Sequence, residues 1–178
     1  MGEGRVSLRI ATLNVRGCRQ AEKRAAVFRS LEAVPFEVLF MQECHLGSAA
    51  DVALFSGGWR RGPSVWGVGK GSADGVGILF KSWEFELESE VVVVPGRVLS
   101  VDGTWRGVAF RAICVYAPAR VGERTGFFKV LEPLLYTNKS CYMGGDFNIN
   151  LERERDLNRI LTSANMIDRL KKVMSTVV

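Results

Sequence analysis

Five side chains that could bind a ligand or a metal lie at the ends of apolar, strand-like segments of this 178-residue chain. They are Asn14 after Ile10–Leu13, Glu43 after Phe40–Gln42, Tyr116 before Ala117-Pro118, and Asp146 followed closely by Asn148. A residue of this kind, taken alone, is more often a cap or a turn former than a catalyst. Open α/β sheets collect ligand-binding groups at the carboxyl ends of their strands, so the shared placement predicts one common site.

The chemistry that these residue types fit is hydrolysis of a phosphodiester. Magnesium neutralises charge on phosphate oxygens and prefers carboxylate and water ligands, and Glu43 can supply such a carboxylate. Asp146 can orient or deprotonate the attacking water, and Asn148 can hydrogen-bond a phosphate oxygen. Tyr116 is a neutral donor that can stabilise charge developing in the transition state. We therefore predict a magnesium-dependent site.

Other familiar catalytic and nucleotide-binding motifs are missing from the sequence. Ser72 stands where the third glycine of a dinucleotide fingerprint would be, and Gly71 follows Lys70 where a P-loop needs Ser or Thr. There is no Gly-x-Ser-x-Gly elbow, and a single histidine, His45, cannot build a histidine-rich zinc site. The carboxylate site is thus the main functional pattern.

Strand and helix signals alternate at first and become β-rich in the middle of the chain. The first elements are a strand over Leu8–Val15, a helix over Arg19–Val34 and a buried strand over Glu37–Gln42. A meander of antiparallel strands is predicted at Gly75–Phe80, Glu84–Val94, Arg97–Val101 and Val108–Tyr116. The last elements are a helix with apolar positions from Phe127 to Leu135, a strand over Ser140–Gly144 and a helical stripe over Leu157–Ala164. This order predicts an α/β sandwich of two packed sheets with helices outside.

The segment Ser56–Gly77 holds eight glycines and one proline, which favours turns and an irregular surface loop. Trp59, Trp66, Arg60 and Arg61 within it could stack on DNA or neutralise it. A disordered surface loop without such a role explains the composition equally well.

Composition and charge fit a single globular domain, over residues 1–178. Hydrophobic residues make up 47% of the chain, and no apolar run approaches the roughly 20 residues that span a bilayer. The N-terminus has no apolar stretch of signal-peptide length, so we expect an intracellular protein with no membrane partner. The net charge of +5 suits a polyanion such as DNA. We expect the four widely spaced cysteines to be reduced core thiols.

Five motifs, in this order, resemble the endonuclease/exonuclease/phosphatase superfamily. They are Thr12-Leu13-Asn14, Gln42-Glu43, Gly75-Val76-Gly77-Ile78-Leu79-Phe80, Val115-Tyr116-Ala117-Pro118 and Gly144-Gly145-Asp146-Phe147-Asn148. The most specific of them is Gly-Asp-Phe-Asn after an apolar strand. Within the superfamily the chain most resembles the apurinic-like endonuclease domain of LINE-type (non-LTR) retrotransposons, from Arg9 to about Leu170.

The resemblance implies a four-layer α/β sandwich, dependence on Mg²⁺ or Mn²⁺, and nicking of target DNA to prime reverse transcription. It makes Glu43 the metal ligand with Asn14 beside it. It gives Tyr116 and Asn148 contacts to the scissile phosphate, and Asp146 the positioning of the water. It further implies a parent protein with a C-terminal reverse transcriptase region, and favours the nucleus as its location. Asp168 resembles a structural acidic position and not a catalyst.

The sequence departs from the family pattern in one respect. Family members continue with further strands that include a Ser-Asp-His stretch, and nothing here matches it. We therefore expect the domain to be incomplete at the C-terminus, with strands missing and with weak or no activity, because a catalytic histidine commonly contributes about two to four orders of magnitude. His45 is expected to be a surface or DNA-proximal residue.

Two alternatives stay open at this point. One is a degenerate, non-catalytic relic that binds nucleic acid. The other is an abasic-site repair endonuclease or another phosphodiesterase of the same superfamily.

Overall fold

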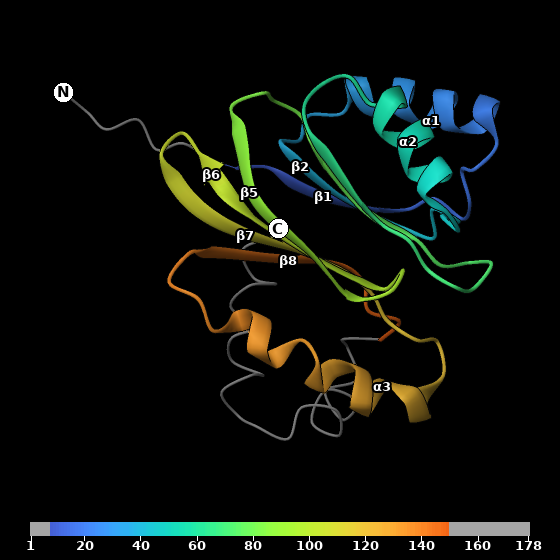
Figure 1. Ribbon diagram of the computed structural model, residues 1–178, viewed down its shortest axis with the longest axis vertical. Helices are drawn as coiled ribbons and strands as arrows, with labels where there is room; N and C mark the ends of the chain where they lie inside the picture. Colours follow the sequence, from blue (N-terminus) through green and yellow to red (C-terminus); the bar gives the residue numbers. More distant parts are fainter. Residues whose placement is uncertain (1–7, 150–178) are drawn as a thin grey trace.

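Two four-stranded sheets lie face to face between helices in the computed structural model, which describes residues 8–149 (Figure 1). In chain order the elements are β1 (Ile10–Asn14), α1 (Ala21–Ala33), β2 (Val38–Gln42), α2 (Ala49–Gly58), β3 (Ser64–Gly67), β4 (Val76–Phe80), β5 (Phe85–Val94), β6 (Val98–Trp105), β7 (Val108–Tyr116), α3 (Val121–Lys129), the 3-10 helix η1 (Glu132–Leu135) and β8 (Ser140–Asp146). The predicted helix over Leu157–Ala164 and the predicted structural residue Asp168 lie outside the described residues.

Each sheet contains one parallel pair of strands, and these pairs bring the strand ends together. The strand orders are β1-β2-β4-β3 and β5-β6-β7-β8. In the first sheet β1 and β2 are parallel, with Asn14 opposite Gln42 at their ends. In the second, β7 and β8 are parallel, with Tyr116 opposite Asp146. Parallel strands end at the same edge of a sheet, so each pair delivers two chain segments to one place.

Three apolar cores separate the four layers. Between the sheets, Phe40 and Ile78 of the first sheet belong to one cluster with Leu99 and Cys114 of the second. The outer face of the first sheet packs with residues of α1 and α2, and the outer face of the second with residues of α3 and η1. Figure 1 shows the two sheets between α1 and α2 on one side and α3 on the other. The predicted four-layer α/β sandwich is confirmed.

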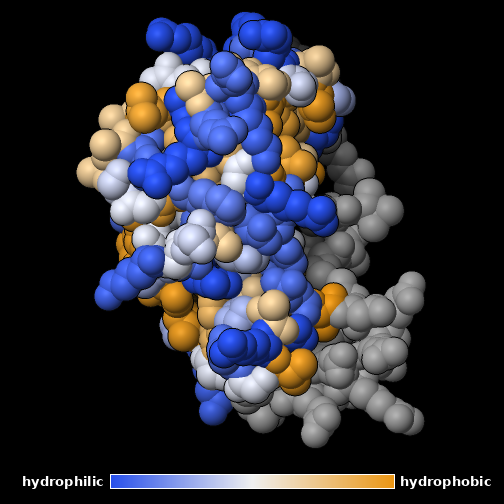
Figure 2. All heavy atoms as spheres, turned by 90° about the vertical axis from the view of Figure 1, so that its right-hand side faces the viewer, coloured by the Kyte–Doolittle hydropathy of each residue, from blue (hydrophilic) through white to orange (hydrophobic). Residues whose placement is uncertain are grey.

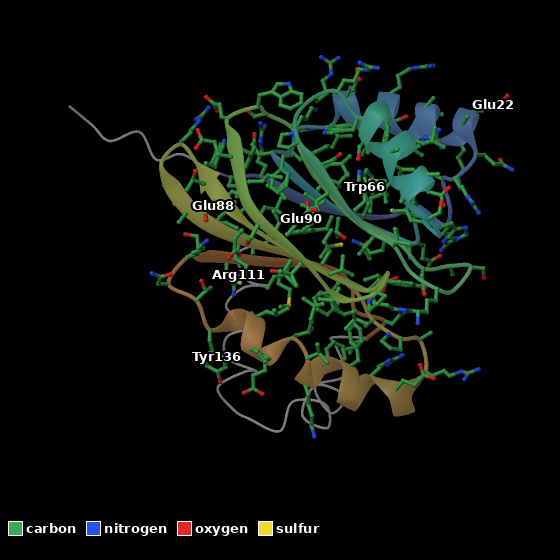
Figure 3. The ribbon with its side chains drawn as sticks, in the orientation of Figure 1. Glu22, Trp66, Glu88, Glu90, Arg111 and Tyr136 are labelled. Atoms are coloured by element: carbon green, nitrogen blue, oxygen red, sulfur yellow. The ribbon has the colours of Figure 1, made fainter. Side chains whose placement is uncertain are left out.

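The prediction of an irregular loop over Ser56–Gly77 was wrong. This stretch contains the end of α2, strand β3 and the start of β4. Trp59 and Trp66 are both buried, and the Trp59 indole donates to the Phe80 carbonyl at 3.0 Å. Figure 3 shows Trp66 between the first sheet and its helices. Aromatic rings bury more apolar surface than other side chains, so burial of the two tryptophans outweighs the turn preference of the glycines. Because both indoles are buried, neither can stack on DNA.

The predicted meander and the predicted helix from Phe127 to Leu135 needed smaller corrections. The run Gly75–Phe80 forms β4 of the first sheet, so only the other three predicted strands make the antiparallel meander β5, β6 and β7. The apolar stripe from Phe127 to Leu135 is divided between α3 and η1. Pro133 explains the break, because proline has no N–H for the helical ladder.

The cysteines are free thiols, as predicted: Cys18, Cys44 and Cys114 are buried, whereas Cys141 is half-buried. Within residues 8–149, no helix has the length and apolar character needed to cross a bilayer.

Candidate active site

Asn14 joins the predicted metal ligand, Glu43, to the predicted catalytic carboxylate, Asp146. Its side-chain nitrogen donates to Glu43 Oε1 at 2.8 Å and to Asp146 Oδ2 at 3.0 Å. Its side-chain oxygen accepts from the backbone N–H of Arg16 at 3.1 Å, which fixes the orientation of the amide. Asp146 is 132 residues away in sequence and belongs to the other sheet. The amide of Asn14 therefore links the sheets at the edge where their parallel strands end.

Glu43 receives a second donor from the other sheet. The Tyr116 hydroxyl donates to the same Oε1 atom at 3.1 Å. The other oxygen, Oε2, accepts no hydrogen bond from any residue between 8 and 149. This arrangement holds one oxygen of the carboxylate in place and leaves the other for a ligand.

The surroundings of Tyr116 keep its phenol protonated. Partial burial raises the pKa of Tyr116 above its ordinary value, and the charge of Glu43 and the hydrogen bond to it act in the same direction. The guanidinium of Arg97 opposes this shift. A tyrosine with a raised pKa is a neutral hydrogen-bond donor at physiological pH.

Asp146 and Asn148 form a tight turn after β8. The backbone N–H of Asn148 donates to Asp146 Oδ1 at 3.0 Å, so both oxygens of Asp146 are held by neutral donors. The Asn148 side-chain nitrogen donates to the Ala117 carbonyl at 2.8 Å, next to Tyr116. All five predicted site residues thus meet at one edge of the sandwich, where β1, β2, β7 and β8 end. Figure 2 shows that the side of the molecule on the right in Figure 1 carries a broad band of hydrophilic residues.

Two glycines before Asp146 let β8 approach its neighbours closely. A Cβ on Gly144 would lie 2.5 Å from the Phe40 ring of the facing sheet. A Cβ on Gly145, whose φ is +145°, would lie 1.9 Å from the Val115 carbonyl oxygen. A larger residue at Gly144 would push β8 away from the facing sheet, and one at Gly145 would push it away from its neighbour β7. The Gly-Gly-Asp sequence therefore has a packing reason: it brings the Asp146 carboxylate within reach of Asn14.

The backbone at the site is in an unusual conformation. Glu43 and Asn148 both have φ values in the left-handed region, 52° and 50°. This conformation costs roughly 1–2 kcal/mol for a residue with a side chain. Such residues tend to cluster at functional sites, where the surrounding structure enforces them.

The donor set meets the modest needs of a magnesium ion. No cluster of three or more His, Cys, Asp or Glu side chains occurs in the described part of the chain. Mg²⁺, however, is usually held by one or two carboxylates and keeps several waters. Glu43 and Asp146 share the Asn14 donor and have no Lys, Arg or His ion pair among residues 8–149, so their negative charges are not compensated from within.

His45 and Arg97 also lie near the site. The half-buried His45 ring packs against the loop after β1. The contact is so close that a Cβ on Gly17 would lie 2.5 Å from the ring. The Arg97 guanidinium lies over the Tyr116 ring, 4.4 Å from its centroid. Sequence reasoning missed Arg97, whose only signal is a charged residue between the turn Pro95-Gly96 and an apolar strand.

Residues 11–163 match the model of the Endonuclease/Exonuclease/phosphatase family. The chain is 30% identical over 169 residues to the transposon TX1 uncharacterized 149 kDa protein of Xenopus laevis. That alignment includes 92% of this chain and 13% of the relative.

Solved structures of similar fold include TDP2 from D. rerio humanized by 14 mutations, with a TM-score of 0.63 and 18% identity over 86% of this chain and 66% of that one. Another is the endonuclease domain of TRAS1, a telomere-specific non-LTR retrotransposon, with a TM-score of 0.56 and 14% identity over 80% of this chain and 61% of that one. At these identities the similarity to the two structures shows the fold alone.

Proposed function

Because the chain belongs to the endonuclease/exonuclease/phosphatase family, whose members are typically nucleases or phosphodiesterases, we propose that it supplies the catalytic site of a Mg²⁺- or Mn²⁺-dependent DNA endonuclease. The main support is the hydrogen bonding of Glu43 and Asp146 to one Asn14 nitrogen. Two carboxylates that neutral donors hold side by side supply the oxygen ligands that a hard cation prefers and a group that can orient a water nucleophile.

Each site residue has a distinct part in this proposal. Glu43 binds the cation through the oxygen that Asn14 and Tyr116 leave free. A bound divalent ion would neutralise charge on the oxygens of the scissile phosphate. Asp146, oriented by Asn14 and by the Asn148 N–H, holds the attacking water and accepts its proton.

Tyr116 and Asn148 act on the phosphate in this proposal. The neutral phenol of Tyr116 has one O–H, which donates to Glu43 Oε1 and would turn to a phosphate oxygen as charge develops there in the transition state. Asn148 has one amide proton on the Ala117 carbonyl and a second that is available for a phosphate oxygen. Asn14 itself orients the two carboxylates, since its amide already makes three hydrogen bonds.

DNA as the substrate is supported by charge and by similarity. The chain has a net charge of +5, and exposed Arg16 and Arg120 follow β1 and β7 closely, next to the site. Arginines at such positions can neutralise backbone phosphates on either side of the cleaved bond. The similarity to the transposon TX1 protein supports a retrotransposon role, in which the nick primes reverse transcription in the nucleus.

The proposal is tested by nicking of supercoiled plasmid with the full chain in excess over the plasmid. We expect conversion to the open circle with Mg²⁺ or Mn²⁺ and none with EDTA. The rate is expected to be low, since the sequence has no Ser-Asp-His stretch. Thr12→Ala is a suitable matched control, because Thr12 bonds Gln42 on the same strand pair without touching either carboxylate.

Two outcomes would count against the proposal. Unchanged nicking by both Glu43→Ala and Asp146→Ala would reject the site. Binding of plasmid without any metal-dependent nicking, at every chain concentration tried, would instead favour a non-catalytic nucleic-acid-binding protein.

A further inference from the structure

Arg97 directly precedes β6 of the second sheet and makes two kinds of contact with Tyr116. Its guanidinium lies over the phenol ring, 4.4 Å from the centroid, and its carbonyl oxygen accepts the Tyr116 backbone N–H at 2.7 Å. A guanidinium on the face of an aromatic ring restricts where that ring can lie. The hydroxyl of the same ring donates to Glu43. Arg97 is thus one contact away from the proposed metal ligand.

Asp74 fixes the position of Arg97. The Asp74 carboxylate pairs with the Arg97 guanidinium at 2.9 Å and also accepts the N–H of Gly71 at 2.8 Å. Asp74 is only 8% exposed. A partly buried pair with a second hydrogen bond is held more firmly than an exposed ion pair.

The same short segment also supports the turn that carries Glu43. The carbonyls of Asp74 and Gly75 accept the N–H groups of Leu46 and Cys44, at 3.1 and 2.9 Å. The N–H of Gly75 donates to the carbonyl of Gly96, directly before Arg97, at 3.0 Å. Residues 74–75 therefore bridge the turn after Glu43 and the turn before Arg97.

Close backbone packing makes this bridge rigid. Gly96 has a φ of +66°, and a Cβ there would lie 2.5 Å from Gly69 Cα. A Cβ on Gly69 would lie 2.1 Å from the Cβ of Asp74. These glycines let three loop segments touch. This part of the Gly-rich stretch, to which the sequence assigned no definite role, therefore has a structural role.

From these contacts we propose that Arg97 is a positioning residue that holds the Tyr116 hydroxyl on Glu43, with Asp74 as its anchor. The expected effect of Arg97 on the nicking rate rests on the proposed function. The structural content of the inference, the coupling of Arg97 to Tyr116 and Glu43, stands apart from any activity.

A kinetic double-mutant cycle tests the proposal in the full chain. Arg97→Ala should lower the single-turnover nicking rate about tenfold at saturating chain concentration, a loss in keeping with one partly desolvated cation–aromatic contact. In a Tyr116→Phe background the same change should have an effect of less than about twofold, because contacting residues act non-additively. Arg97→Lys should recover part of the rate, since it keeps a cation over the ring.

Arg111→Ala is the matched control. Arg111 pairs with Asp102 at nearly the same side-chain exposures as Arg97 with Asp74, 21% and 12% against 27% and 12%. It lies on β7 opposite Cys141, near the start of β8, whereas Tyr116 lies opposite Asp146 at its end. Figure 3 shows Arg111 between β8 and the helices below it. Its loss should leave the nicking rate unchanged.

A spectroscopic cycle tests the positioning without any nicking. In ¹³C-tyrosine-labelled chain, the Tyr116 ring carbon that bears the hydroxyl is assigned by its absence in Tyr116→Phe. Glu43→Gln should shift this resonance, because it weakens the acceptor of the phenol. In Arg97→Ala and in Asp74→Asn the shift caused by Glu43→Gln should shrink by at least half, whereas in Arg111→Ala it should be unchanged.

The outcomes separate this proposal from the proposed function. If no variant nicks DNA but the spectroscopic coupling is found, the positioning stands and the proposed function fails. The positioning would be overturned if Glu43→Gln shifted the Tyr116 resonance as much in the Arg97→Ala variant as in the original chain. It would also be overturned if Arg97→Ala lowered the nicking rate equally in the Tyr116 and Tyr116→Phe backgrounds. A lower salt dependence of DNA binding in Arg97→Ala, by about one in the log–log slope, combined with additive rate losses, would make Arg97 a phosphate contact instead.

Discussion

Acidic side chains lie near both ends of β8, and their hydrogen-bond donors differ in charge. At the start of β8, Asp102 accepts two hydrogen bonds from Arg111, at 2.7 and 2.8 Å, and pairs with Lys139 at 3.3 Å. At the other end, Glu43 and Asp146 are held by the amide of Asn14 and by other neutral donors. Asp102 has its counter-charge within the chain. No cationic side chain among residues 8–149 pairs with Glu43 or Asp146, so a ligand would have to supply their counter-charge.

This difference separates structural acids from acids that could bind a cation. The pKa of Asp102 is lowered, first by its hydrogen bond to Arg111, and further by Lys139. Its charge therefore contributes to the stability of the fold. Glu43 and Asp146 share one neutral donor, so under the proposed function we expect like-charge repulsion between them to limit their contribution to stability when no cation is bound. The contrast leads to opposite expectations for activity and for stability.

Neutralising the site carboxylates should have the largest effect. Glu43→Gln and Asp146→Asn each keep the side-chain volume, and we expect each to lower the metal-dependent nicking rate by about three orders of magnitude, because metal-ion help amounts to several kcal/mol. The free energy of unfolding without metal should stay the same or rise. Plasmid nicking and urea unfolding measure the two effects. A large loss of stability in either variant would contradict the comparison.

Removing the shared donor should have the next largest effect. Asn14→Ala leaves both carboxylates in the chain but frees their orientation, and groups that orient metal ligands commonly contribute 10–100-fold. We expect a loss of about that size in nicking rate, while Thr12→Ala should leave the rate unchanged. Equal rates for Asn14→Ala and the original chain would show that the amide has no orienting role.

Breaking the structural pair should reverse the pattern. Asp102→Asn removes a charge that Arg111 and Lys139 need, so the free energy of unfolding should fall by about 1–3 kcal/mol at pH 7. The nicking rate should be retained at temperatures where the variant stays folded. Because the pKa of Asp102 is lowered in the folded state, its contribution is complete above the unfolded-state value near 4 and is lost as the pH falls through the folded-state value. Urea unfolding from pH 7 to pH 2 should show the two proteins converging below about pH 4.

Metal binding should give the smallest effect. At ten times its dissociation constant, Mg²⁺ should stabilise the original chain by about 1.4 kcal/mol, a shift of a few degrees in Tm. Glu43→Gln should lose this shift, whereas Asp102→Asn should keep it from its lower starting point. Calorimetry with Mg²⁺ and with EDTA distinguishes these cases. An equal shift in Glu43→Gln would place the cation elsewhere.

Local patterns in the sequence were enough to predict most strands and to propose five candidate site residues at strand ends. Strand-end positions predicted Asn14, Glu43, Tyr116, Asp146 and Asn148, because strand ends and turn signals depend on neighbouring residues. The predicted bounds of β2 and β8 differ from the structure by one or two residues. Two of the three corrections, to the stretch around Trp59 and Trp66 and to the meander, concern packing partners distant in the chain, whereas the third follows from the local effect of Pro133.

By itself the sequence determined which side chains could do chemistry and the alternation of strands and helices, since both follow from residue types and short spacings. Only the tertiary structure decided that Asn14 bonds both carboxylates, and that Asp74 and Arg97 lie behind Tyr116. These contacts join segments of two different sheets. Their geometry depends on how closely β8 packs against the facing sheet at Gly144 and against β7 at Gly145, which no local pattern specifies.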